Sequence, residues 1–190
     1  MARNIYGLDL GTYEIKVYDK KQDSTWKEKN VIAIVDGKEI LAVGDEAYAM
    51  FERTPGNIEV VFPMKEGVIS RFTDMQYLLQ NLLKKERRFA RGSEYLIAVP
   101  TDVTEVEKRA FFDLVVHSTA KAKEVSIVER GVAQCIGMGV DVRKTKGMLI
   151  ADFGAATTEL SVVGSGGMVL NKMLKIGGMT FDVAVQNMVR

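Results

Sequence analysis

Short runs in which apolar residues dominate or alternate with polar ones open the chain and predict strands. These runs cover residues 5–10, 15–18, 31–35 and 39–43. The last two flank Asp36-Gly37, a pair typical of tight hairpin turns because both residue types tolerate positive φ. The pattern therefore predicts that the fold starts with antiparallel strands.

Helical spacing of apolar residues appears in the middle of the chain. After a turn at 54–57 and a strand at 58–63, a helix is predicted from Thr73. Its apolar residues lie mostly three or four positions apart: Met75, Leu78, Leu79, Leu82, Leu83 and Phe89. A second helix is predicted at Thr104, where the sequence Thr-Glu-Val-Glu forms a capping box.

Strands and helices then alternate, with strands predicted at 94–99 and 124–128 and a buried helix at 132–138. Parallel strands need long crossover connections, and a helix is the usual one. The alternation therefore predicts parallel pairing with right-handed crossovers.

The final third repeats the opening scheme. Three strands of a meander, a Gly-Gly pair and a helix to Arg190 are predicted, and the strands cover 147–153, 157–163 and 168–176. This copy stops at its first helix. The predicted organisation is one domain at residues 1–146, with a small insert at about 44–71, and the beginning of a second domain at 147–190.

The repeated segments also carry candidate chemistry. Each ends an apolar strand on Asp-x-Gly, at Asp9 and Gly11 in the first and at Asp152 and Gly154 in the second. Backbone N–H groups of a Gly turn can face an anion because no side chain blocks the approach. One such turn is usually only a hairpin. Two that face each other would grip a nucleotide's phosphates, with both aspartates holding a hydrated Mg²⁺.

Composition narrows the function classes. With 26 basic and 25 acidic residues the formal charge is +1, which gives no electrostatic footprint for nucleic acid. The single Cys135 and single His117 exclude disulfide frameworks and Cys/His metal sites. No apolar run approaches the about 20 residues of a spanning helix, and no secretory segment opens the chain. A cytoplasmic protein is predicted.

The motifs and their order resemble the MreB family of bacterial actin-like rod-shape proteins, within the actin, Hsp70 and sugar-kinase ATPase superfamily. The segments that carry the resemblance are 43–47, 53–58, 63–69, Val99-Pro100, 104–109 and 176–178. The resemblance covers nearly the whole chain. It implies an α/β, actin-like (ribonuclease H-like) ATPase fold, with the first domain complete and the second partial.

The resemblance also implies a site for ATP and Mg²⁺. The residues at its nucleotide-binding positions are Asp9, Gly11, Thr12, Tyr13, Glu14, Lys16, Asp152, Gly154, Ala155, Ala156 and Thr157. Asp9 and Asp152 would hold Mg²⁺ through water. Lys16 has the same offset from its aspartate as a phosphate-binding lysine of actin, while strand alternation alone equally allows an exposed lysine.

Several of these positions depart from the family pattern. Tyr13 is bulky where a small residue is expected, and Glu14 places a carboxylate where phosphate approaches. Ala155 and Ala156 replace two glycines, so each adds a methyl group, with added strain wherever the position needs positive φ. Nucleotide binding is therefore predicted to be weakened or lost.

Arg130 occupies the position of the family's catalytic glutamate. A guanidinium cannot accept a proton from water, although it can stabilise phosphate charge. Glu129 is a candidate substitute, but a shift of one residue at a strand end turns a side chain to the other face. Arg130 could instead cap the next helix or pair with an acid. At most a weak ATPase is predicted.

The resemblance implies a cytoskeletal protein of cell shape and cell-wall morphogenesis that binds ATP between the hairpins and forms filaments. It would work in the cytoplasm at the inner face of the membrane, with membrane contact through partners. The departures favour an alternative, a non-hydrolysing scaffold or regulator of a working MreB paralogue or a cell-wall synthesis complex. A sugar or acetate kinase of the same superfamily is a third candidate, without an identifiable substrate aspartate.

The resemblance further implies that the adenosine pocket and much of the filament contact lie beyond the position of Arg190, so that the chain is truncated relative to the family. An incomplete sheet leaves an exposed edge and an uncovered apolar face. Self-association is therefore predicted, as a filament or as a dimer that exchanges the terminal hairpins and the helix at 179–190.

Overall fold

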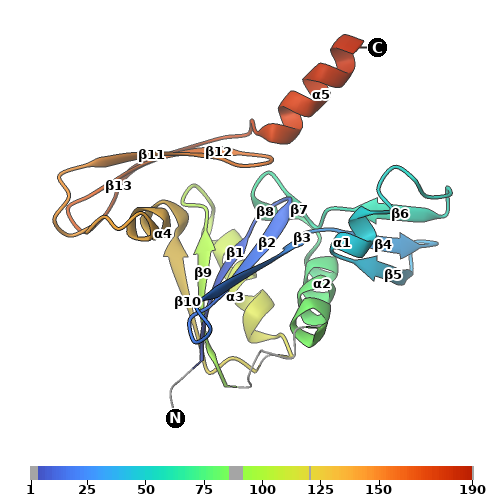
Figure 1. Cartoon of the computed structure of the whole chain (residues 1–190), viewed down its shortest axis with the longest axis horizontal. Helices are drawn as coiled ribbons and strands as arrows, with labels where there is room; N and C mark the ends of the chain where they lie inside the picture. Colours follow the sequence, from blue (N-terminus) through green and yellow to red (C-terminus); the bar gives the residue numbers. More distant parts are fainter. Residues whose placement is uncertain (1–3, 86–91, 120, 190) are drawn as a thin grey trace.

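A five-stranded mixed sheet forms the centre of the computed structural model, which describes residues 4–85, 92–119 and 121–189 (Figure 1). The strand order is β10-β9-β1-β2-β3. The strands are β1 Ile5–Leu10, β2 Glu14–Asp19, β3 Ser24–Lys29, β9 Glu94–Val99 and β10 Glu124–Glu129.

The pairing within this sheet confirms the predicted antiparallel start and the predicted parallel crossovers. β1 pairs antiparallel with β2 and parallel with β9, and β9 pairs parallel with β10. The sequence prediction missed β3, which pairs antiparallel with β2. Its residues Ser-Thr-Trp-Lys-Glu-Lys contain a single apolar side chain, so no apolar alternation marks the strand.

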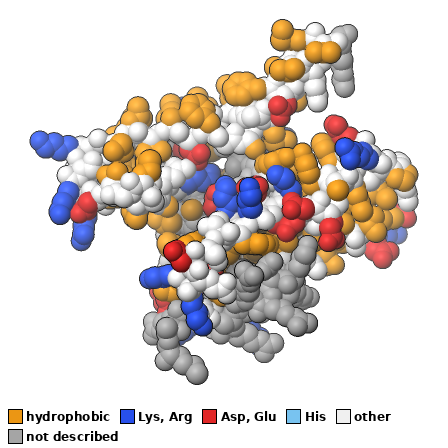
Figure 2. Space-filling view, viewed as in Figure 1, with side chains coloured by type: hydrophobic (Ala, Val, Ile, Leu, Met, Phe, Trp, Pro, Cys, Tyr) orange, Lys and Arg blue, Asp and Glu red, His pale blue; other side chains and the backbone are white. Residues whose placement is uncertain are grey.

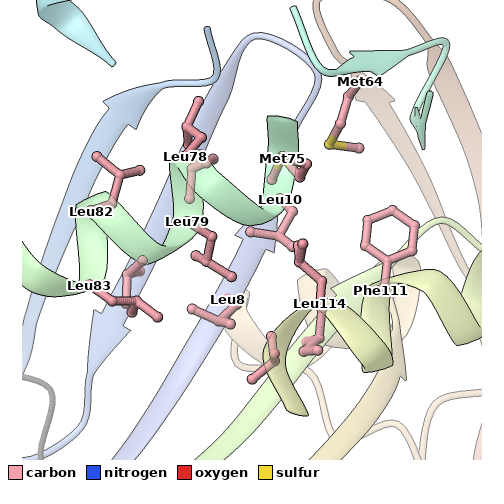
Figure 3. Close-up of a cluster of buried hydrophobic side chains, with 14 of the residues drawn as sticks. Leu8, Leu10, Met64, Met75, Leu78, Leu79, Leu82, Leu83, Phe111 and Leu114 are labelled. Carbon is pink, nitrogen blue, oxygen red and sulfur yellow. The ribbon is translucent and has the colours of Figure 1, made fainter. Parts of the chain in front are cut away.

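The helices α2 (Phe72–Lys85) and α3 (Glu105–Val116) contribute to the core beside this sheet (Figures 1 and 3). Alternate strand residues enter the core because successive side chains point to opposite faces of a sheet. The largest fully buried side chains of the cluster are Tyr6, Leu10, Ile15, Ile32, Met64, Met75, Leu78, Leu79, Leu82, Ile97, Phe111 and Leu114.

The helix limits agree closely with the prediction. α2 begins one residue before Thr73, and the predicted core residue Phe89 lies outside the described residues. The capping box is confirmed, since the Thr104 side chain accepts from the Glu107 backbone N–H and Glu107 accepts from the Thr104 backbone N–H.

A smaller sheet lies beside the central one, in the order β5-β4-β6 (Figure 1). Its strands are β4 Ile32–Val35, β5 Glu39–Val43 and β6 Ile58–Val61, with the short helix α1 Asp45–Tyr48 after β5. It begins at Ile32 because β4 pairs with both β5 and β6. The insert predicted at about 44–71, which contains α1 and β6, stays a prediction. The hairpin of β7 (Met64–Lys65) and β8 (Val68–Ile69) then leads into α2.

The final third forms the predicted meander, β11 Met148–Phe153, β12 Thr158–Gly164 and β13 Gly167–Leu174. Helix α4 (Arg130–Gly137) packs against it, with Cys135 fully buried in their shared core. The contact is close at Gly131, where a Cβ atom would lie 2.6 Å from Ser161 Oγ. The division of the chain at residue 146 stays a prediction.

The last helix, α5 (Gly178–Val189), projects away from the rest of the molecule and has no buried residue (Figure 1). Apolar side chains gather along it and over the β11–β13 sheet in Figure 2. Large exposed apolar residues of α5 are Met179, Phe181, Val183, Val185, Met188 and Val189. Within the described residues, no helix combines the length and the apolar character that crossing a membrane requires.

The close contact at Gly131 gives a stability prediction. Gly131→Ala places a methyl group against Ser161 and Met168, and overpacking of this kind costs about 1–3 kcal/mol. We expect the urea unfolding midpoint of the variant to fall. Gly137→Ala is the matched control on the same helix, because nothing lies within 4 Å of its added methyl group. Equal midpoints for the two variants would show that α4 does not pack tightly on the sheet.

Candidate functional site

The first Asp-x-Gly turn joins β1 to β2. The Gly11 N–H donates to the Glu14 carbonyl at 3.1 Å, and a Cβ atom on Gly11 would lie 2.7 Å from that oxygen. Only glycine therefore permits this closure. Two outside contacts hold the turn: Asn30 Nδ2 donates to the Gly11 carbonyl at 2.7 Å, and the Gly67 N–H donates to Thr12 Oγ1 at 3.2 Å.

The second turn joins β11 to β12 and has the same design. The Gly154 N–H donates to the Thr157 carbonyl at 2.9 Å. The start of α5 fastens the turn, because Met179 N–H donates to the Ala155 carbonyl at 2.8 Å. Neither Ala155 nor Ala156 has a positive φ. The two alanines therefore occupy space in the turn, but they do not have the backbone strain that a positive φ would cause.

Both turns border one cavity of about 340 Å³. Every residue predicted to bind nucleotide lines it: Asp9, Gly11, Thr12, Tyr13, Glu14, Lys16, Asp152, Gly154, Ala155, Ala156 and Thr157. Arg130 lines it as well, together with Gly67, Gln134 and Phe153, which the sequence reasoning missed. Their roles toward a ligand stay predictions, but the structure brings the two turns together.

Asp9 lies between two cations. Lys16 Nζ is 3.1 Å from its Oδ2 atom, and Arg130 Nη2 is 3.4 Å from its Oδ1 atom. The register of the hairpin explains the first contact, because Asp9 and Lys16 are directly opposite each other on β1 and β2. The strand lysine therefore faces the cavity and pairs with its aspartate.

Arg130 is the first residue of α4 and its side chain is only 12% exposed. Besides Asp9, its guanidinium lies 3.9 Å from Glu159, which is 3% exposed and accepts a hydrogen bond from the Thr101 N–H. Pairing with acids, one of the alternatives open from the sequence, is thus confirmed. Glu129 is not among the described residues that line the cavity, so its substitution for the family's glutamate stays a prediction without geometric support.

Asp152 has a partner from the same helix. Gln134 Nε2 donates to Asp152 Oδ2 at 2.8 Å. Gln134 follows Arg130 by four residues, so both side chains lie on one face of α4 and reach the cavity together. This spacing is the sequence signal by which Gln134 could have been found.

The bulky Tyr13 turns toward the small sheet. Its hydroxyl donates to the Tyr48 hydroxyl at 2.6 Å, and its ring stacks on Phe62 with centroids 6.2 Å apart. The pKa of Tyr13 is raised to about 12. The hydrogen bond with Tyr48 is the largest cause, and burial is the second. Next to it, the Glu14 carboxylate lies 3.5 Å from Lys29 Nζ, which offsets the repulsion predicted for phosphate.

Known proteins of one family match the sequence of this chain. The family model described as MreB/Mbl protein matches residues 3–190. The cell shape-determining protein MreB of Escherichia coli (strain K12) is 37% identical over 198 residues, covering 100% of this chain and 56% of the relative. The cell shape-determining protein Mbl of Bacillus subtilis (strain 168) is 32% identical over 192 residues, covering 100% and 57%.

Solved structures give the same picture of the fold. The crystal structure of MreB5 of Spiroplasma citri superposes with a TM-score of 0.90 at 29% identity, covering 100% of this chain and 57% of that one. A MamK double helical filament gives 0.79 at 20% identity, with coverage of 99% and 59%, and supports the fold alone. The predicted actin-like fold is confirmed. The chain spans about half the length of the curated relatives it matches.

The environment of Tyr13 predicts a pH dependence. Its pKa in the folded chain is about 12, above the ordinary 10.0, so the stability it contributes is complete below pH 10 and is lost as the pH rises toward 12. We expect Tyr13→Phe to lose less stability than the wild type between pH 9 and pH 11, measured by urea unfolding. The exposed Tyr77→Phe is the control and should follow the wild type. Parallel losses for all three proteins would rule out this linkage.

Proposed function

The chain belongs to the MreB/Mbl family, and from this premise we propose that it binds the phosphates of a nucleotide between its two Asp-x-Gly turns. The observation that carries the proposal is the shared cavity, which both turns border. We further propose that the chain acts within an actin-like, filament-forming protein of bacterial cell shape, in the cytoplasm.

Unused backbone donors support phosphate as the ligand. In the described part of the chain, the N–H groups of Thr12, Tyr13, Ala155 and Ala156 donate no hydrogen bond, although all four residues line the cavity. Successive N–H groups in a turn form a concavity that binds anions. Lys16, on the same wall, adds a positive charge. The chemistry of this donor set fits a phosphate group.

Relatives supply a second line of support. MreB5 of Spiroplasma citri, 29% identical to this chain, has been solved bound to ADP and bound to AMPPNP. Space for more than phosphate is present beside the cavity here, because Tyr13 and Ala155 also line a neighbouring cavity of about 520 Å³ that extends to α5. We propose that the rest of the nucleotide lies on this side.

Slow or absent hydrolysis forms part of the proposal. A general base needs a carboxylate free to take a proton from water. The carboxylates that line the cavity are Asp9, Glu14 and Asp152, and each already has a partner within the described chain. The position of the family's glutamate carries Arg130 instead. At most a weak ATPase results.

The contacts of both aspartates argue against the Mg²⁺ that the family resemblance implies. Asp9 is paired with two cations, and Asp152 accepts from the Gln134 amide. No step of the proposed function is therefore assigned to the metal.

The alternative function, a non-hydrolysing scaffold or regulator of a working paralogue or a cell-wall synthesis complex, is favoured by one observation. Arg130 joins Asp9 of β1 to Glu159 of β12, so a side chain of the protein itself links the two sheets beside the cavity. Sedimentation with and without nucleotide separates the two functions. The filament function requires assembly that depends on nucleotide, whereas a scaffold sediments identically in both conditions.

The two alanines in the second turn provide the test of phosphate binding. Each methyl group takes up space in the cavity, and neither residue has a strained φ. We expect the double variant Ala155→Gly, Ala156→Gly to bind a fluorescent ADP about tenfold more tightly than the wild type, measured by anisotropy. This factor corresponds to a loss of about 1.4 kcal/mol of binding free energy through crowding of the ligand by the methyl groups.

Ala49→Gly is the matched control, because Ala49 does not line this cavity. Its affinity should equal that of the wild type. If neither the wild type nor the double variant bound ADP, the proposed function would be wrong.

A further inference from the structure

Two cationic side chains of the protein lie beside Asp9, in the place where a metal-dependent site would hold a metal ion. Arg130 reaches Asp9 Oδ1 from one side and Lys16 reaches Oδ2 from the other, at 3.4 and 3.1 Å. A divalent cation that approached this carboxylate would be repelled by the positive charges of Arg130 and Lys16, which are already in contact with it. Asp9 is therefore poorly suited to hold a metal ion or the water around it.

Arg130 is built into the wall of the cavity rather than placed there by a flexible surface contact. Its side chain is 12% exposed, and its other anionic neighbour, Glu159, is almost fully buried and held by the Thr101 N–H. The residue after it, Gly131, packs directly on β12, which fixes the start of α4. The position of the guanidinium is thus set by the tertiary structure.

Arg130 also has an unused donor. Its Nε atom is buried and has no hydrogen-bond partner among the described residues. A buried N–H without a partner is costly, so the contacts within the described chain do not fully satisfy this guanidinium. Guanidinium groups bind phosphate through two parallel hydrogen bonds more readily than a lysine does. Arg130 therefore has the charge that a phosphate needs, on a residue that lines the cavity.

We propose that the cavity binds nucleotide phosphate without a divalent cation, with Arg130 and Lys16 supplying the positive charge that the metal would bring. On binding, the phosphate competes with Asp9 for these two side chains. The inference rests on the proposed function, since it requires that a nucleotide occupies the cavity. It goes beyond that function in assigning the source of the neutralising charge.

The test compares ADP affinity in buffer with Mg²⁺ and in buffer with EDTA, using fluorescent ADP and the 190-residue chain. The expected dissociation constants of the wild type agree within about threefold. Arg130→Lys keeps a charge at this place, so its dissociation constants in the two buffers should also agree within about threefold, although both should be larger than those of the wild type. In Arg130→Glu three carboxylates face one another, so binding in EDTA should fall by at least about tenfold and return when Mg²⁺ is added.

Arg143→Glu is the control, because Arg143 is 87% exposed and its partner Asp141 does not line the cavity. It should match the wild type in both buffers. Urea unfolding of every variant separates lost binding from lost folding. If Arg130→Glu fails to fold, the wild type and Arg130→Lys still decide the question.

The outcomes separate metal-free binding from nucleotide binding as such. Wild-type binding that tightens more than about tenfold with Mg²⁺ overturns this inference and leaves the proposed function in place. Lack of ADP binding in both buffers overturns both. Equal affinities in the two buffers, with metal dependence appearing only in Arg130→Glu, support the inference.

Discussion

The start of α4, from Arg130 to Gln134, determines how the central sheet and the β11–β13 sheet meet. Arg130 pairs with Asp9 of the central sheet and lies beside Glu159 of the β11–β13 sheet. Gly131 allows the helix to approach Ser161 so closely that no side chain fits between them. Gln134, one turn later, holds Asp152. The two Asp-x-Gly turns face one cavity because these residues of α4 contact the strands of both turns.

The start of α4 also shapes the chemistry of the cavity. Arg130, at the position where the family resemblance implies a glutamate, carries a fixed positive charge, and the carboxylates that line the cavity are each paired with a cation or an amide. A cavity with these contacts is suited to hold an anion and poorly suited to activate water. Binding and turnover, which go together in an ATPase, are therefore separable properties here, and the proposed function depends on the first alone.

The C-terminal part of the described chain differs in kind from the rest. Backbone bonds to the second turn fasten the beginning of α5, while the remainder of the helix presents apolar side chains to solvent. A helix of this length gains most of its stability from packing rather than from propensity. The family relatives are about twice as long as this chain, and the apolar surface of α5 and the outer sheet is consistent with the proposed self-association.

The sequence by itself determined the local elements and much of the fold. Alternation predicted β1, β2 and β9, the capping box predicted the start of α3, and the motif order indicated the actin-like fold. Prediction was less complete where apolar periodicity is weak. It missed β3, which has one apolar residue. Pairing with β2, rather than a local apolar pattern, makes this segment a strand.

Every residue at the nucleotide-binding positions that the family resemblance implies lines the cavity. Only the tertiary structure decided what those residues contact. It gave Arg130 two acidic neighbours, brought Gln134 to Asp152, turned Tyr13 toward Tyr48 and left both alanines unstrained. The physical reason is distance along the chain: Asp9, Arg130 and Glu159 are far apart in sequence, and their charges interact only after α4 has packed between the two sheets.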